Sequence, residues 1–146
     1  MLRAALAVIA GYLAAIATMF VLFAGLWLIL GAQGSYEPGT WVLSQKWLVA
    51  NIAIELVAGI CAGLICALIA KSSRPPNVLA LFFLAFGVLN VLMMMKAGVQ
   101  DLGARPDDVG MFAAMQKHQD PIWLGWMHPV LGITGVLIGA RLRKKS

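Results

Sequence analysis

The sequence predicts an all-α integral membrane protein, a single domain over residues 1–146 built as a bundle of four transmembrane helices. Apolar residues make up 62% of the chain and charged residues 12%, against roughly 45–50% and 25% in soluble globular proteins. The apolar residues fall in long runs, and the cations gather where these runs end. A soluble domain of this length cannot bury so much apolar surface, so we expect lipid to surround the chain.

Four apolar runs are long enough to cross a membrane, at about 4–31, 47–70, 77–97 and 122–140. Each provides the ~20 residues that a helix needs to span a hydrocarbon core of ~30 Å. The first run is too long for the apolar core of a cleaved signal peptide, and we expect it to be retained as a helix. Four crossings place both termini on one side of the membrane.

The distribution of Lys and Arg predicts which side that is. Seven of the 11 cations lie near the chain ends or in the turn between the second and third runs, and four lie in the other two loops or, for Lys96, at the end of the third run next to one of them. Cytoplasmic segments carry the excess of Lys and Arg, so both termini are predicted to be cytoplasmic, in a bacterial-type inner membrane. This clustering accounts for the net charge of +5. A nucleic-acid partner is not expected, because the cations do not alternate with exposed aromatic residues.

Tryptophan and lysine mark the predicted outer ends of the helices. All five tryptophans lie there or in the first loop. Indole rings favour the head-group region because the ring is apolar while its N–H needs a polar partner, and lysine reaches the same region by snorkelling. The predicted interface anchors are Trp27, Trp47, Trp123, Trp126 and Lys96.

The second outer loop is predicted to contain a short amphipathic helix. Its start is predicted at Arg-Pro-Asp-Asp, residues 105–108, and Val109, Phe112 and Met115 follow at three-residue spacing. We expect this helix to lie on the outer membrane surface. The alternative is an ordinary polar loop.

Small residues predict where the helices pack most closely. Gly59 and Gly63 in the second run have the GxxxG spacing, which lets another backbone approach one helix face. The fourth run offers further small positions at Gly132, Gly135 and Gly139. We predict that these glycines are helix-packing residues. The pattern leaves open whether their contacts form within one chain or between subunits.

Glu55 is the only carboxylate inside a predicted span, and Asn51 lies one turn before it on the same helix face. A charge in the membrane centre costs ~2.5–3.5 kcal/mol on insertion scales, so we expect Glu55 to be protonated or to have a partner. Asn90 in the third run and His128 in the fourth lie at a similar depth, ~8–12 Å from their outer helix ends at ~1.5 Å per residue. Lipid satisfies none of these groups, which predicts mutual contact.

Two interpretations of this polar cluster remain open. It is an outward-facing binding site for a proton, a cation or a polar head group, or it is a set of interhelical hydrogen bonds worth about 0.6–2 kcal/mol each. The sequence predicts no catalytic residue, cofactor or metal site. The spacing of Cys61 and Cys66 fits neither a redox motif nor a zinc site, and common enzyme signatures are missing.

The functional prediction is therefore a membrane protein that is not an enzyme. The leading hypothesis is an accessory subunit of other membrane proteins, or a homo-oligomer, because four short spans leave much helix surface for lipid or a protein partner. The alternative is a small oligomeric transporter or channel coupled to a proton or cation through Glu55. A third hypothesis, an enzyme acting on a lipid or quinone, is disfavoured by the missing signatures.

Overall fold

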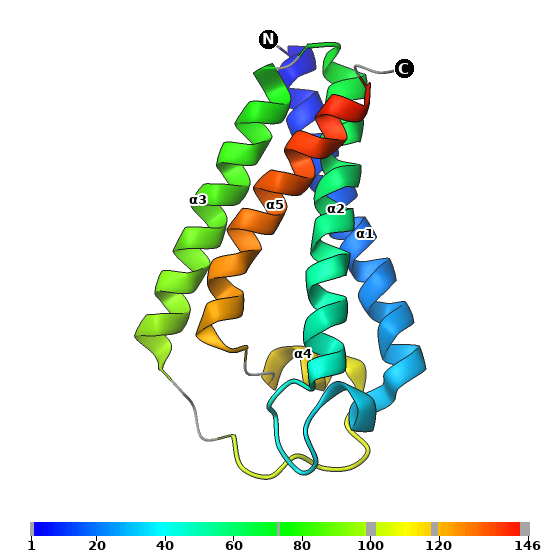
Figure 1. Ribbon diagram of the computed structural model, residues 1–146, viewed down its shortest axis with the longest axis vertical. Coiled ribbons are helices and arrows are strands. Elements are labelled where there is room, and N and C mark those ends of the chain that lie inside the picture. The colour runs from blue at the N-terminus through cyan, green and yellow to red at the C-terminus, as the bar shows by residue number, and fades with distance from the viewer. Residues whose placement is uncertain (1, 73, 99–101, 118–119, 144–146) are drawn as a thin grey trace.

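The computed structural model describes residues 2–72, 74–98, 102–117 and 120–143. Within them the chain forms five helices (Figure 1): α1 (Leu2–Ser35), α2 (Gln45–Ala70), α3 (Arg74–Ala97), α4 (Met111–Lys117) and α5 (Ile122–Leu142). Among these, α1, α2, α3 and α5 are long and apolar enough to cross a membrane. The described part of the chain contains no strand, only an isolated bridge between Tyr36 and Leu43. The predicted set of four helices long and apolar enough to span a membrane is therefore confirmed, and their crossing of a membrane stays a prediction.

Local chemistry sets several helix ends. Gly31 leaves the helical conformation, with φ 59° and ψ −172°, so the regular part of α1 ends where the first predicted span ends. The Ser44 hydroxyl caps α2 by accepting a hydrogen bond from the Trp47 backbone N–H. At the other end of α2, Lys71 adopts the left-handed conformation and its N–H donates to the Ala67 carbonyl.

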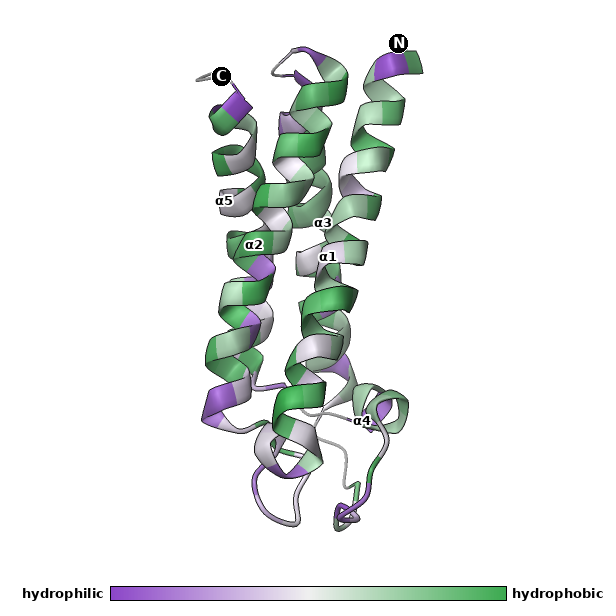
Figure 2. Cartoon of the chain, turned by 90° about the vertical axis from the view of Figure 1, so that its right-hand side faces the viewer, coloured by the Kyte–Doolittle hydropathy of each residue, from purple (hydrophilic) through white to green (hydrophobic). Residues whose placement is uncertain are grey.

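The four long helices converge at one end of the molecule and diverge toward the other. α2 packs between α1 and α5, and α5 also contacts α3. The N- and C-termini lie together at the converging end, and α4 lies at the diverging end (Figure 1). Green, hydrophobic segments cover most of the long helices, and the more hydrophilic segments concentrate toward the two ends (Figure 2). An apolar band with polar ends is the profile expected of a bundle that spans a bilayer.

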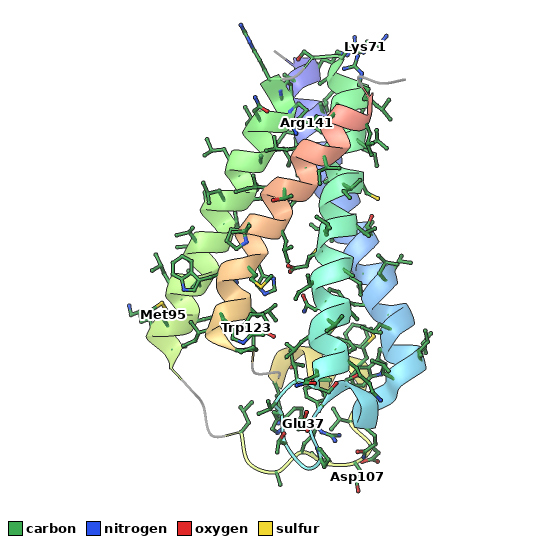
Figure 3. The ribbon with its side chains drawn as sticks, in the orientation of Figure 1. Glu37, Lys71, Met95, Asp107, Trp123 and Arg141 are labelled. Atoms are coloured by element: carbon green, nitrogen blue, oxygen red, sulfur yellow. The ribbon has the colours of Figure 1, made fainter. Side chains whose placement is uncertain are left out.

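Cations gather at the converging end, which we call the basic end. Arg3 Nε donates to the Ile69 carbonyl at 2.7 Å, and an Arg143 guanidinium nitrogen donates to the Ala67 carbonyl at 2.9 Å. Both arginines therefore meet the C-terminus of α2, where free carbonyls carry partial negative charge. Lys71 and Arg141 lie at this end, whereas Glu37 and Asp107 lie at the opposite end (Figure 3).

Glycines hold α2 and α5 together. A Cβ atom on Gly59 would lie 3.0 Å from the Gly135 Cα, and one on Gly63 or Gly139 would overlap backbone of the facing helix. A Cβ on Gly132 would lie 3.4 Å from Phe83 of α3. These contacts form within one chain. They continue into a core of small and medium residues toward the basic end, which includes Ala7, Ala15, Ala62, Cys66, Leu79, Ala80 and Val136.

At the diverging end, residues 36–44 and 102–117 fold together into what we call the cap. Tyr36, Trp41, Leu43 and Ala114 form its buried cluster. The Tyr36 hydroxyl donates to the Ala114 carbonyl at 3.0 Å, which ties α4 to the first loop. The cap packs on the ends of α1 and α2, where Trp27 and Trp47 adjoin its cluster.

The predicted helix start at residues 105–108 is wrong, because α4 begins at Met111. Arg105 is instead 4% exposed inside the cap. Its guanidinium donates to the Thr40 carbonyl, the Pro106 carbonyl and Gln33 Oε1. A buried guanidinium needs acceptors on several sides, and a first helical turn, whose N–H groups are themselves donors, cannot supply them. The placement of α4 on the membrane surface stays a prediction.

Candidate binding cavity

Glu55 of α2 and His128 of α5 touch inside the bundle. The contact joins His128 Nδ1 to Glu55 Oε1, and the side chains of His128 and Glu55 are 25% and 11% exposed. Glu55 lies one turn before Gly59, and His128 lies one turn before Gly132. Residues four apart share a helix face, so the close approach of α2 and α5 at their glycines brings the two side chains together.

A carboxylate and an imidazole in contact share a proton in one of two ways. The imidazole donates to the carboxylate, as a neutral ring or as an imidazolium, or the carboxylic acid donates to the imidazole. The imidazolium–carboxylate pair and the imidazole–carboxylic acid pair both avoid an isolated charge within the apolar bundle, which would be costly, whereas a neutral ring leaves the carboxylate charge hydrogen-bonded but uncompensated.

Two buried acceptor atoms lie beside this contact. Asn51 is 8% exposed, and among the described residues neither Asn51 Oδ1 nor Glu55 Oε2 has a hydrogen-bond partner. A buried polar atom left unsatisfied costs about 1–3 kcal/mol. The two atoms belong to side chains one turn apart on the same face of α2.

The Glu55–His128 pair lies where two cavities meet. We call the first the deep chamber; it has a volume of about 360 Å³ and is lined by α1, α2, α3 and α5. The second, the cap chamber, has a volume of about 410 Å³ and is lined by α1, α2, α5 and the cap. Glu55, His128, Ile16 and Met19 line both chambers. The polar pair therefore borders both spaces.

The deep chamber reaches the molecular surface between α1 and α3. Ile16 of α1 and Phe86 and Asn90 of α3 line it, and all three residues are exposed. Asn90 therefore shares a chamber with Glu55 and His128 but lies at its exposed rim, apart from their contact. In a bilayer this opening would face the lipid.

Aromatic rings form one wall of the cap chamber. The rings of Phe23 and Trp47 stack with centroids 5.7 Å apart, and Trp27 meets Trp47 edge-on at 6.2 Å. All three residues line the chamber. Two of the predicted anchors, Trp27 and Trp47, are therefore lining residues. The other predicted anchors, Trp123, Trp126 and Lys96, are exposed on α5 and α3; the anchoring role of all five stays a prediction.

Tyr36 closes the cap chamber on the side of the first loop. Burial raises the pKa of Tyr36 to about 12, partly opposed by the Arg105 guanidinium and reinforced by Asp120. The guanidinium carbon lies 5.4 Å from the centre of the Tyr36 ring. The phenol therefore stays neutral at physiological pH and keeps its hydrogen bond to α4.

The sequence interpretation missed three residues that shape the cavity. Arg105 and Tyr36 hold the cap together. The sequence signal for Arg105 was a single arginine that precedes a proline in a loop rich in aspartate. Gly87 of α3 was also missed: a Cβ there would lie 2.7 Å from the Pro129 Cβ of α5. A lone glycine inside an apolar run was the available signal for that contact.

The described residues contain no group of three or more His, Cys, Asp or Glu side chains that could hold a metal ion. Comparisons with protein-family models, with curated proteins and with solved structures find no match.

Proposed function

We propose that this chain is a multi-pass protein of the cell inner membrane, with both termini in the cytoplasm, that binds a small amphipathic molecule. The Glu55–His128 pair receives the polar group of this ligand, and the chambers receive its apolar part. The observation that carries the proposal is a carboxylate–imidazole contact at the junction of two apolar chambers. Ligand sites are typically cavities of about 300–1,000 Å³, mostly apolar, with a few placed polar groups.

The position of the opening supports a ligand that is soluble in the membrane. The deep chamber meets the surface between α1 and α3, beside exposed apolar side chains such as Ile16 and Phe86. A molecule dissolved in the bilayer would reach the pair along this route without crossing the cap. Such a molecule needs an apolar body for the bilayer and a polar group for Glu55 and His128.

The packing beyond the pair favours binding over conduction. From Gly59 toward the basic end, α2 and α5 touch backbone to backbone, and a core of small residues fills the space between the helices. A channel or a transporter coupled through Glu55 would require these contacts to separate. The accessory-subunit hypothesis draws on exposed apolar helix surface, which lipid explains equally well. Ligand binding is therefore our leading proposal, and no enzymatic step is part of it.

Brominated amphipaths test the proposal, because bromine quenches tryptophan fluorescence on contact and Trp27 and Trp47 line the cap chamber. The exposed Trp123 and Trp126 are first replaced by Phe to remove quenching from the lipid side. The chain in lipid nanodiscs is then titrated with bromophenylethylamine, bromophenylethanol and bromophenylacetate. We expect saturable quenching by at least one of the three.

Ala24→Phe places a ring inside the cap chamber, which Ala24 lines, and should abolish the saturable quenching. Ala17→Phe is the matched control, because Ala17 is an exposed residue of the same helix that lines neither chamber; it should leave the quenching unchanged. Circular dichroism and gel filtration check that both variants fold. If none of the three compounds quenches saturably in the starting chain, the binding proposal is overturned.

A further inference from the structure

We propose that the polar group of the ligand is a protonated amine, whose N–H groups donate to Glu55 Oε2 and Asn51 Oδ1. This inference rests on the proposed binding function and names its ligand class. Both oxygens are buried and have no hydrogen-bond partner among the described residues, and both side chains line the cap chamber. An atom that only accepts hydrogen bonds requires a donor, and a primary ammonium group offers three.

The charge around the cavity also favours a cation. Of the described residues that line the two chambers, the ones able to carry charge near neutral pH are Glu55, Asp120 and His128. The nearest cations of the cap are engaged elsewhere: Arg105 lies over the Tyr36 ring and Lys117 over the Trp41 ring, and neither lines a chamber. Among the described lining residues, the chambers therefore have two carboxylates, Glu55 and Asp120, and no Lys or Arg, and the one group there able to become a cation, His128, is in contact with Glu55.

The aromatic wall of the cap chamber supports the same ligand class. The stacked rings of Phe23 and Trp47 come from α1 and α2 and line the chamber that Asn51 and Glu55 also line. Aromatic faces attract cations through the negative potential above the ring, most strongly for Trp. An organic ammonium therefore finds acceptors for its N–H groups and an aromatic surface for the carbon atoms attached to it.

The test compares head groups on one body. Bromophenylethylamine carries a positive charge and N–H donors, its trimethylammonium analogue carries the charge without donors, bromophenylethanol has a donor without the charge, and bromophenylacetate carries the opposite charge. In the quenching assay described above, we expect the amine to bind about tenfold more tightly than the trimethylammonium analogue, because only the amine satisfies the two acceptors. The alcohol should be weaker than the amine, and the carboxylate weakest.

Variants assign the effect to the two acceptors. Asn51→Leu should weaken amine binding about tenfold, whereas Asn77→Leu, the same change at an exposed position near the basic end of α3, should leave it unchanged. Glu55→Gln should remove the preference for the amine over the alcohol. The head-group comparison in the unsubstituted cavity decides the question even if a variant fails to fold.

Each outcome separates the inference from the function on which it rests. If the trimethylammonium analogue, the alcohol or the carboxylate binds as tightly as the amine, the amine inference is overturned and ligand binding stands. Equal affinities would mean that the two oxygens do not select the head group. If no compound binds, both the inference and the proposed function fall.

Discussion

A buried guanidinium joins the two loops of the cap. The Arg105 side chain donates to the Thr40 carbonyl at 3.0 Å and to Gln33 Oε1 at 3.3 Å, and its backbone N–H donates to the Gly39 carbonyl at 3.1 Å. The planar guanidinium presents several donors in fixed directions, which the compact lysine ammonium does not. At 4% exposure, water cannot replace a lost partner, so each of these bonds matters for the cap.

We therefore expect Arg105→Lys to destabilise the chain by about 2 kcal/mol, in the range of one to two hydrogen bonds to a charged group. The charge is kept, so a loss of stability would report the lost geometry. The measurement is the free energy of unfolding in mixed detergent micelles, followed by circular dichroism. Arg74→Lys, at an exposed arginine of α3, is the matched control and should change little. If the two variants are equally stable, the hydrogen bonds of the Arg105 guanidinium do not stabilise the cap.

For single residues of the site, the sequence predicts a position along each helix but not the direction of each side chain. Helix rise predicts one level for Glu55, Asn90 and His128, since depth depends only on position along the chain, and their depth in a membrane stays a prediction. The structure brings two of them together and leaves Asn90 at the rim of the deep chamber. Which side chains meet depends on how each helix is rotated about its own axis. Contacts with neighbouring helices set that rotation, and it cannot be read from one sequence.

At the scale of elements, the α2–α5 contact organises the bundle. In α2 the GxxxG residue Gly59 meets Gly135 of α5 and Gly63 meets the Val136 backbone, while Gly139 of α5 meets the backbone of Ile60 and Leu64. The spacing predicted a close helix contact because missing side chains are visible in the sequence. The spacing could not identify the partner helix, because a helix face made of small residues can pack closely against any other such face. The four spans were easier to predict, since a run of ~20 apolar residues is a signal along the chain itself.

Gly63→Ala tests this contact through the sign of its effect. In a helix with free space, Gly→Ala is stabilising by about 1 kcal/mol, because alanine restricts the unfolded chain. At Gly63 the added methyl would overlap the Val136 backbone, so α2 and α5 must separate. We expect a net loss of about 2 kcal/mol or more, in the range of overpacked cores, measured by the same unfolding assay.

The matched control is Gly25→Ala in α1, where an added methyl meets nothing within 4 Å. It should leave stability unchanged or raise it. A stabilising effect at both positions would argue against the close packing of α2 on α5. Because Gly59 follows Glu55 by one turn, separation of the helices at Gly63 should also weaken the Glu55–His128 contact and reduce ligand quenching.

At the scale of the whole molecule, the two ends differ in charge and in packing. The basic end carries both termini and the close helix contacts, and the other end carries the cap, the chambers and acidic groups such as Glu37 and Asp107 (Figure 3). The charge asymmetry was visible in the sequence, because the order of the loops and spans along the chain decides which cations share one side of the membrane. The cap was not, because it is built from contacts between loops about 65 residues apart, such as that of Arg105 with Thr40.

This asymmetry predicts the orientation of the chain in the membrane. Segments rich in Lys and Arg are retained in the cytoplasm, so the basic end should be cytoplasmic and the cap should face outward.

In a chain with Cys61 and Cys66 replaced by Ala, a single cysteine is introduced at Asp108 in the cap or at Ser72 at the basic end. Asp108→Cys should react with a membrane-impermeant maleimide in spheroplasts, and Ser72→Cys only after the membrane is permeabilised, since both positions are exposed. The reverse pattern would place the cap in the cytoplasm, and labelling of both positions in intact spheroplasts would mean that the chain inserts in two orientations. With the predicted pattern, the cap chamber lies in the outer half of the membrane, and the ligand reaches it from the lipid of that half.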